Sequence, residues 1–172
     1  MYFIGACLLT AILNVAMVMD ILTGKIKNVL ILAGLALGLW YQFWVHGISG
    51  GLVFGGGALL PFVITFPLFA FRAVGAGDVK LLTVAGGFLG MSVIPGFLLL
   101  TLLLGGGMAL LKMLFQRTLG QRFMYLAGYM EQCLRTRRLE PYGQPFGEEQ
   151  AVIHLSIPIL FAALICMMGG IV

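Results

Sequence analysis

Residues 72–82 read RAVGAGDVKLL and place Asp78 between two basic residues, in sequence that is otherwise strongly apolar. Apolar runs lie on both sides of this stretch, at 48–71 and 79–93. A charged side chain is costly inside a bilayer and is usually retained for a function. The stretch therefore marks the boundary between two predicted helices. It is also a candidate functional site.

The composition of the chain is that of an integral membrane protein. Of its 172 residues, 61% are hydrophobic and 9% are charged, and the mean hydropathy is +1.09. These values lie far outside the range of soluble globular proteins. Ten Lys and Arg exceed six Asp and Glu, but so few charges cannot form a phosphate-binding face, which excludes nucleic acid as a partner.

Six apolar runs are predicted to be helices that cross the membrane, because a hydrocarbon core of about 30 Å needs about 20 helical residues. A single helix over 79–115 would be about 55 Å long, which is too long for one span. Pro95 and Gly96 offer a break near its middle. The sequence thus predicts an all-α integral membrane protein with six transmembrane helices, at 2–22, 29–45, 48–71, 79–93, 96–114 and 151–171.

The basic residues predict the orientation, since Lys and Arg in short loops stay in the cytoplasm. With six spans and the N- and C-termini outside, all ten lie on the cytoplasmic side: Lys25, Lys27, Arg72, Lys80, Lys112, Arg117, Arg122, Arg135, Arg137 and Arg138. Five spans would put the largest cluster outside. The acidic residues fall on the same side: Asp20, Asp78, Glu131, Glu140, Glu148 and Glu149. We therefore expect a multi-pass protein of the cell (inner) membrane whose charged chemistry lies at its cytoplasmic face.

The segment at about 115–150 is the longest polar part of the chain and is predicted to be a cytoplasmic loop. It contains a basic amphipathic pattern, with apolar residues at spacings of four and three: Leu119, Phe123, Leu126, Met130 and Leu134. Such a helix would lie on the anionic inner leaflet or dock a partner protein. With this loop included, residues 1–172 are predicted to form a single transmembrane domain.

Two aspartates are predicted to share one depth in the membrane. Asp20 lies near the cytoplasmic end of the first span, and Asp78 begins the fourth span from the same side. Two aspartates that share a proton can activate water with one carboxyl and protonate a leaving group with the other. This chemistry hydrolyses a peptide without a metal or an organic cofactor. The three cysteines have no zinc-ligand spacing.

Gly75 and Gly77 bracket Ala76 immediately before Asp78. They predict backbone that turns sharply and lets an extended substrate strand approach the carboxylate. The alternative is that these glycines only let helices pack closely, which is common in membrane proteins. A GxGD sequence that opens a membrane helix opposite a second aspartate is the more specific signal.

These features resemble the type IV prepilin peptidases, membrane aspartyl proteases of the GxGD kind. GAGDVKLL at 75–82 matches the family's GxGDxKL, and Asp20 followed by TGKIKN at 23–28 is similar to the family's first aspartate and its basic-Ile-x-Asn stretch. The resemblance covers most of 1–114 and, more loosely, the last helix with Ile157-Pro158. It implies that Asp20 and Asp78 are the catalytic pair of an aspartic endopeptidase.

The resemblance also implies the substrate, since the family removes the short basic leader of prepilins or pseudopilins at the cytoplasmic membrane face. Gly75, Gly77 and Lys80 are assigned to substrate binding. Alternative roles for Lys80 are a charge partner for a nearby carboxylate and an anchor at the membrane surface. Besides the substrate, membrane lipids and pilus-assembly proteins are expected partners.

The chain departs from the larger bifunctional members, because it lacks their N-terminal extension and cysteine-rich loop. It is similar instead to the small peptidase-only branch found with tight-adherence pili. Lys27 also stands where the family usually has proline.

Sequence features are also compatible with two other functions. GISG at 47–50 resembles the GxSG of rhomboid serine proteases, with His154 as base, but Ser49 and His154 fall at opposite ends of spans about 30 Å long, whereas catalysis requires about 3 Å. His154 matches the depth of the aspartates and is expected to be a hydrogen-bonded structural residue.

The non-enzymatic alternative is a small proton-coupled membrane carrier or a pilus-assembly scaffold, in which Asp20 and Asp78 bind or relay protons.

Overall fold

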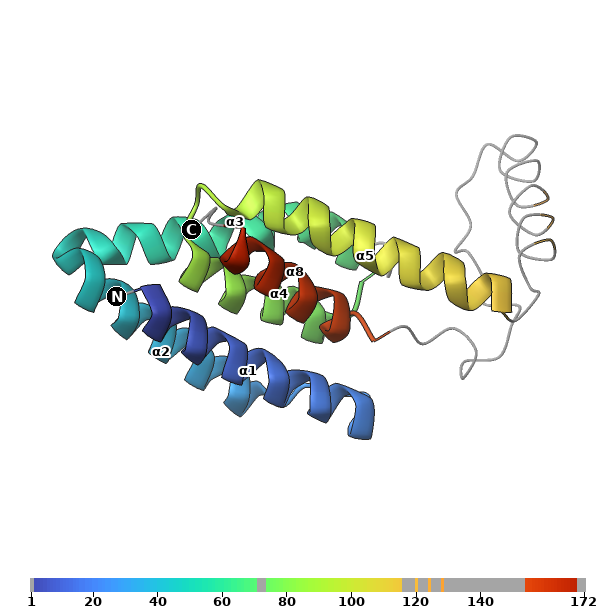
Figure 1. The fold of residues 1–172 in the computed structure, drawn as a ribbon, viewed down its shortest axis with the longest axis horizontal. Coiled ribbons are helices and arrows are strands. Elements are labelled where there is room, and N and C mark those ends of the chain that lie inside the picture. Colours follow the sequence, from blue (N-terminus) through green and yellow to red (C-terminus); the bar gives the residue numbers. More distant parts are fainter. Residues whose placement is uncertain are drawn as a thin grey trace. The chain divides into compact units, whose positions relative to one another are not determined.

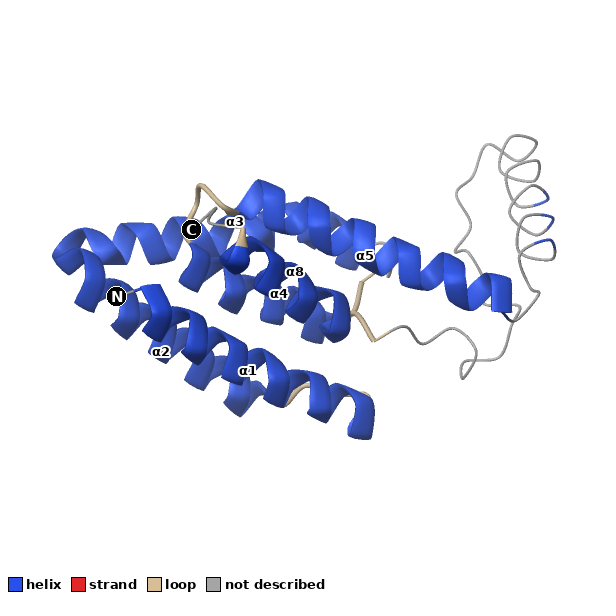
Figure 2. Cartoon of the chain, in the orientation of Figure 1, coloured by secondary structure: helices blue, strands red, loops and turns tan. Residues whose placement is uncertain are grey.

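The computed structural model describes residues 2–70, 74–115, 120, 124, 128 and 154–169. Within these ranges the chain forms helices and no strand (Figure 2), which confirms the all-α prediction. Two compact units are distinguished, one made of Met1–Leu104 with His154–Val172 and the other of Gly105–Ile153. Apart from residues 115, 120, 124 and 128, the predicted amphipathic loop lies outside the described residues.

Six α-helices and one short 3-10 helix make up the described chain (Figure 1). Each of the six predicted apolar runs coincides with one α-helix, although the ends differ by a few residues. In chain order the elements are α1 (Tyr2–Thr23), α2 (Asn28–His46), η1 (Gly47–Ser49), α3 (Gly50–Ala70), α4 (Ala76–Leu89), α5 (Ile94–Phe115) and α8 (Ser156–Met168).

Three helical stretches among the described residues are long and apolar enough to cross a membrane: Phe3–Thr23, Asn28–Ala70 and Ile94–Phe115. The second contains α2, η1 and α3, and α8 is a shorter apolar helix. Large apolar side chains are exposed on these helices, among them Leu32, Leu52 and Leu103. Long, outwardly apolar helices fit a membrane protein. The number of spans and the location of the termini stay predictions.

Helix α4 is the centre of the first unit. It contacts α1, α2, α3 and α8, and nine of its 14 residues are buried. With 14 residues it is about 21 Å long, which is shorter than a hydrocarbon core of about 30 Å. Because the neighbouring helices cover it, α4 need not match the thickness of the lipid.

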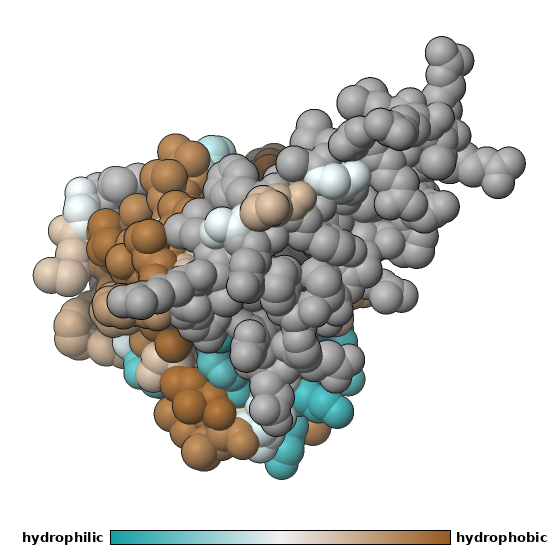
Figure 3. All heavy atoms as spheres, turned by 90° about the vertical axis from the view of Figure 1, so that its right-hand side faces the viewer, coloured by the Kyte–Doolittle hydropathy of each residue, from teal (hydrophilic) through white to brown (hydrophobic). Residues whose placement is uncertain are grey.

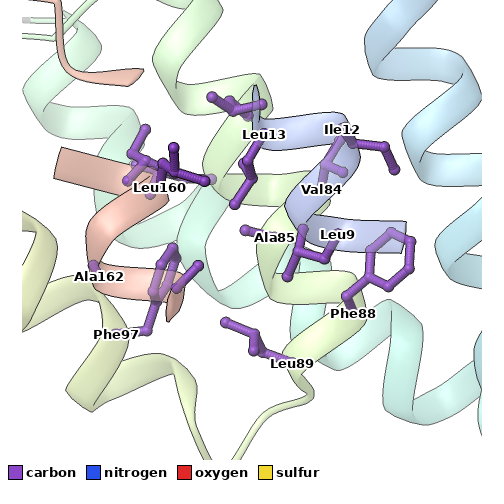
Figure 4. Packing of buried hydrophobic residues seen from close by; sticks show 14 of the residues in the cluster. Leu9, Ile12, Leu13, Val84, Ala85, Phe88, Leu89, Phe97, Leu160 and Ala162 are labelled. Atoms are coloured by element: carbon purple, nitrogen blue, oxygen red, sulfur yellow. The ribbon is translucent and has the colours of Figure 1, made fainter. Parts of the chain in front are cut away.

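The apolar core gathers around this helix. Figure 4 shows side chains from α1, α4, α5 and α8 pointing toward one another, among them Leu9, Leu13, Val84, Phe97 and Leu160. Leu9, Leu13, Val84 and Phe97 are completely buried. Burying each such side chain stabilises the packed state by about 1.5–3 kcal/mol when the alternative is water. In a membrane the same contacts act through close packing.

Two glycines let α3 and α4 approach each other closely. A Cβ atom added at Gly57 would collide with the carbonyl oxygen of Gly86, and one added at Gly86 would collide with the carbonyl oxygen of Gly57. Backbone atoms cannot move aside as a flexible side chain can. These positions therefore require glycine for this helix contact.

The C-terminal end of α4 is capped by a side chain from α2. The last carbonyl groups of a helix lack partners within that helix. The amide nitrogen Nε2 of buried Gln42 donates to the carbonyl oxygens of Gly87 at 3.0 Å and Phe88 at 2.9 Å. Gln42 thus satisfies two buried acceptors in an apolar environment and ties α2 to α4.

The break between the fourth and fifth helices lies earlier than predicted. Helix α4 ends at Leu89 because Gly90 adopts a φ of 77°, a left-handed conformation that glycine enters without steric cost. Helix α5 begins at Ile94, so Pro95 and Gly96 lie in its first turn rather than at the break. Proline is tolerated there because the first-turn N–H groups have no helical partner.

Candidate active site

Asp20 lies in the last turn of α1, which ends where the sequence supplies a glycine. Gly24 has a φ of 63° and its N–H donates to the carbonyl oxygen of Asp20 at 2.8 Å, the arrangement of a glycine C-cap. The Asp20 side chain is buried although it belongs to a strongly apolar helix. A buried carboxylate requires polar partners.

The start of α8 supplies those partners. The hydroxyl of Ser156 donates to Oδ2 of Asp20 at 2.6 Å, across 136 residues of sequence. The ring atom Nδ1 of His154 lies 3.3 Å from the same oxygen but makes no hydrogen bond within the described part of the chain. Helices α1 and α8 pack against each other, and this contact brings all three side chains together.

Asp78 occupies the third position of α4, and Gly75 is the residue that precedes the helix. The Asp78 carboxylate accepts a hydrogen bond from the backbone N–H of Gly75. This is half of a capping box, in which the acid in the first turn reaches back to the residue before the helix. A Cβ atom at Gly75 would lie 3.0 Å from Oδ2 of Asp78, so glycine leaves room for the carboxylate.

The two aspartates are brought to the same end of the unit. In Figure 1 the last turn of α1 and the first turns of α4 and α8 lie at one end of the helices. Asp78 is within electrostatic range of both Asp20 and His154. The prediction that His154 lies near an aspartate is therefore confirmed.

The remaining candidate residues lie around Asp78. A Cβ atom at Gly77 would make an ordinary contact of 3.5 Å with Ile26, so this position is less constrained than Gly75. The Nζ atom of Lys80 donates to Oδ1 of Asn28 at 2.9 Å. This bond connects the GAGDVK and TGKIKN segments, which are far apart in sequence.

Exposed lysines surround this end of the helices. Lys25, Lys27 and Lys80 are exposed and come from the segment after α1 and the second turn of α4. Figure 3 views this end and shows hydrophilic surface beside strongly apolar surface. The site therefore lies where apolar helix surface gives way to charge.

Ser49 and the cavities lie away from the aspartates. The Ser49 hydroxyl donates to the carbonyl oxygen of His46 at 2.7 Å, in the turn between α2 and α3. A cavity of about 500 Å³ opens beside the C-terminal end of α4 and is lined in part by Gln42, His46 and Ser92. Among the residues that the structure describes, no group of three or more His, Cys, Asp or Glu could hold a metal ion.

Ser156 was not predicted from the sequence as a site residue. A hydroxyl group at the start of the last apolar run, at the predicted depth of the aspartates, was a signal that could have found it. Serine is common at helix starts because its side chain often caps the N-terminus of its own helix, so this position alone did not indicate a functional role. Its contact with α1 depends on how the two helices pack.

Comparison with known families gives one match. The model of the type IV leader peptidase family matches residues 7–110, which include both aspartates and both glycines. No curated protein and no solved structure was found to match the chain.

Proposed function

This chain belongs to the type IV leader peptidase family, and from that premise we propose that it is an intramembrane aspartic endopeptidase. It removes the short basic leader peptide of prepilins or pseudopilins at the cytoplasmic face of the inner membrane. Asp20 and Asp78 are the catalytic pair. The observation that supports the proposal is that the last turn of α1 and the first turn of α4, which hold these two aspartates, lie at the same end of the unit (Figure 1).

In this mechanism the two carboxyl groups share one proton and hold a water molecule between them. The ionised carboxylate takes a proton from the water, whose oxygen attacks the carbonyl carbon of the scissile peptide bond. The protonated carboxyl then supports the tetrahedral intermediate and gives a proton to the leaving nitrogen. The C–N bond breaks, and the products are a carboxylate on the leader and a free amine on the mature protein.

The backbone beside the site supports an extended leader peptide as the substrate. The ends of α1 and α4 carry the two aspartates, and three exposed lysines, Lys25, Lys27 and Lys80, lie around them. The basic character of the leader therefore comes from membership of the family and not from the charge of the site. Gly75 and Gly77 offer exposed or half-exposed backbone beside Asp78, and backbone without side chains lets an extended peptide come close. Lys80, bound to Asn28, supports the arrangement of the two motifs.

The test is cleavage of a purified prepilin in liposomes by the wild-type chain, Asp20→Asn and Asp78→Asn. Each substitution removes one acid–base group, and we expect cleavage to fall by at least about 10²–10⁴-fold. Ser49→Ala is the matched control, because it removes an exposed hydroxyl far from the aspartates. Folding of each variant is checked by thermal unfolding.

Three results would contradict the proposal. Retained cleavage in both asparagine variants would exclude the aspartate mechanism, and loss of cleavage in Ser49→Ala would favour a serine protease. If the asparagine variants block proton uptake into the liposomes and the wild type cuts nothing, the proton-coupled carrier becomes the better interpretation.

A further inference from the structure

Ser156 differs from the buried threonines Thr65 and Thr101 in where its hydrogen bond goes. Thr65 and Thr101 are buried, and each donates to the carbonyl oxygen four residues earlier in its own helix. Ser156 is the first residue of α8 and has no preceding helical turn to donate to. Its hydroxyl crosses instead to α1 and meets Asp20.

This bond restrains one oxygen of the Asp20 carboxyl group. A carboxyl group rotates about a broad, nearly two-fold torsion when nothing holds it. The 2.6 Å distance from Ser156 Oγ to Oδ2 is that of a short hydrogen bond to a carboxylate. His154 Nδ1 lies 3.3 Å from the same oxygen, so both contacts from the α8 segment engage Oδ2 and neither engages Oδ1.

We propose that Ser156 is a positioning residue for Asp20, an inference that rests on the function proposed above. By holding Oδ2, the serine hydroxyl turns Oδ1 toward the water molecule that Asp20 shares with Asp78. The serine itself neither attacks the substrate nor transfers a proton. The last helix thereby becomes part of the catalytic machinery, although its residues lie outside the segment of 7–110 that the family model matches.

The kinetic test compares Ser156→Ala and Ser156→Thr with the wild type in the liposome cleavage assay. Loss of the hydroxyl is expected to lower kcat about 10-fold to 100-fold, since small misplacements of a reacting group have effects of this size. KM should stay unchanged, because substrate binding does not use Oδ2. Threonine keeps the hydroxyl and should restore most of kcat.

Thr101→Ala is the matched control, since it also removes a fully buried hydroxyl but leaves Asp20 untouched. We expect wild-type kcat for this variant. Should Ser156→Ala fail to fold, Ser156→Cys replaces it: a thiol of similar size is a weaker donor, and an intermediate kcat is expected. Wild-type kcat in Ser156→Ala or Ser156→Cys, or equal losses in the alanine and threonine variants, would overturn the inference.

A second measurement needs no substrate and separates this inference from the proposed function. The infrared carboxyl band of Asp20 is identified by its loss in Asp20→Asn. It should shift in Ser156→Ala, stay in place in Ser156→Thr and be unaffected by Thr101→Ala. An unshifted band in Ser156→Ala would show that the hydroxyl does not hold Asp20, whether or not the chain cleaves prepilin. A shifted band together with a lowered kcat would support the inference.

Discussion

Gly75 determines how the Asp78 carboxylate is held. The carboxylate accepts a hydrogen bond from the backbone of Gly75. A Cβ atom at Gly75 would lie 3.0 Å from Oδ2 of Asp78. The atom in the way is the end of a side chain, which can rotate aside without unfolding the helix. The GxGD sequence thus has a local steric reason for its first glycine.

Gly75→Ala is therefore expected to leave stability nearly unchanged while kcat falls by about tenfold or more, because the Asp78 carboxyl is displaced. Leader cleavage and thermal unfolding measured on the same preparation check this. Gly96→Ala is the control: this glycine lies in the first turn of α5, close to a helix start as Gly75 is, but open space surrounds its added methyl group. A stable Gly75→Ala variant with full kcat would show that the carboxylate needs no room here.

Because Lys80 donates a hydrogen bond to Asn28, substitutions at these two residues can distinguish two roles for Lys80. If the lysine acts by holding the two motifs together, Lys80→Met and Asn28→Ala should each lower cleavage, and the double variant should be no worse than the more affected single variant. If Lys80 binds the leader directly, Lys80→Met should raise KM equally in the presence and absence of Asn28. A double-mutant cycle on kcat/KM makes this distinction.

Among the helices, α4 depends on Gln42 of α2 for hydrogen bonds to the carbonyl groups at its C-terminal end. Gln42→Leu replaces the amide by an apolar side chain of similar size on α2 and leaves the carbonyl oxygens of Gly87 and Phe88 without their donor. An unsatisfied buried acceptor costs about 1–3 kcal/mol. We expect the free energy of unfolding in detergent to fall by about that amount. Asn14→Ala is the control, because that amide is exposed and bonds only within its own helix.

The contact between α3 and α4 makes a second prediction about packing. Gly86→Ala forces a methyl group into the backbone of Gly57, and overpacking of this kind costs about 1–3 kcal/mol. Gly55→Ala, in α3, adds the same methyl group where no atom lies within 4 Å. We expect thermal unfolding at a lower temperature for Gly86→Ala and no decrease for Gly55→Ala. Equal behaviour of the two variants would contradict the close approach.

For the chain in its membrane, the predicted topology puts every charged side chain on one side. Single cysteines are introduced at Lys25, before α2, and at Ile48, in the exposed turn after it, in a chain whose native cysteines have been replaced. A membrane-impermeant thiol reagent should label the first only from the cytoplasmic side and the second only from the outside. Labelling of both from one side would mean that α2 does not cross the membrane.

Much of the helical arrangement could be predicted from composition, because a backbone in an apolar environment must satisfy its own hydrogen bonds and does so as helices. The six apolar runs each became a helix. The break before α5 was misplaced: Pro95 draws attention in the sequence, but the left-handed Gly90 is what ends α4. The sequence pattern alone does not distinguish a glycine that ends a helix through a positive φ from a glycine that lets two helices pack closely.

The sequence by itself determined the helices, the apolar surfaces and the two motifs that contain Asp20 and Asp78, because these depend on residue type and short spacings. Only the tertiary structure decided which side chains meet: Ser156 with Asp20, Gln42 with the end of α4, and Gly57 with Gly86. The physical reason is that contacts between distant helices depend on how each helix is rotated and how closely it packs. Those quantities arise from many weak contacts acting together rather than from any local run of residues.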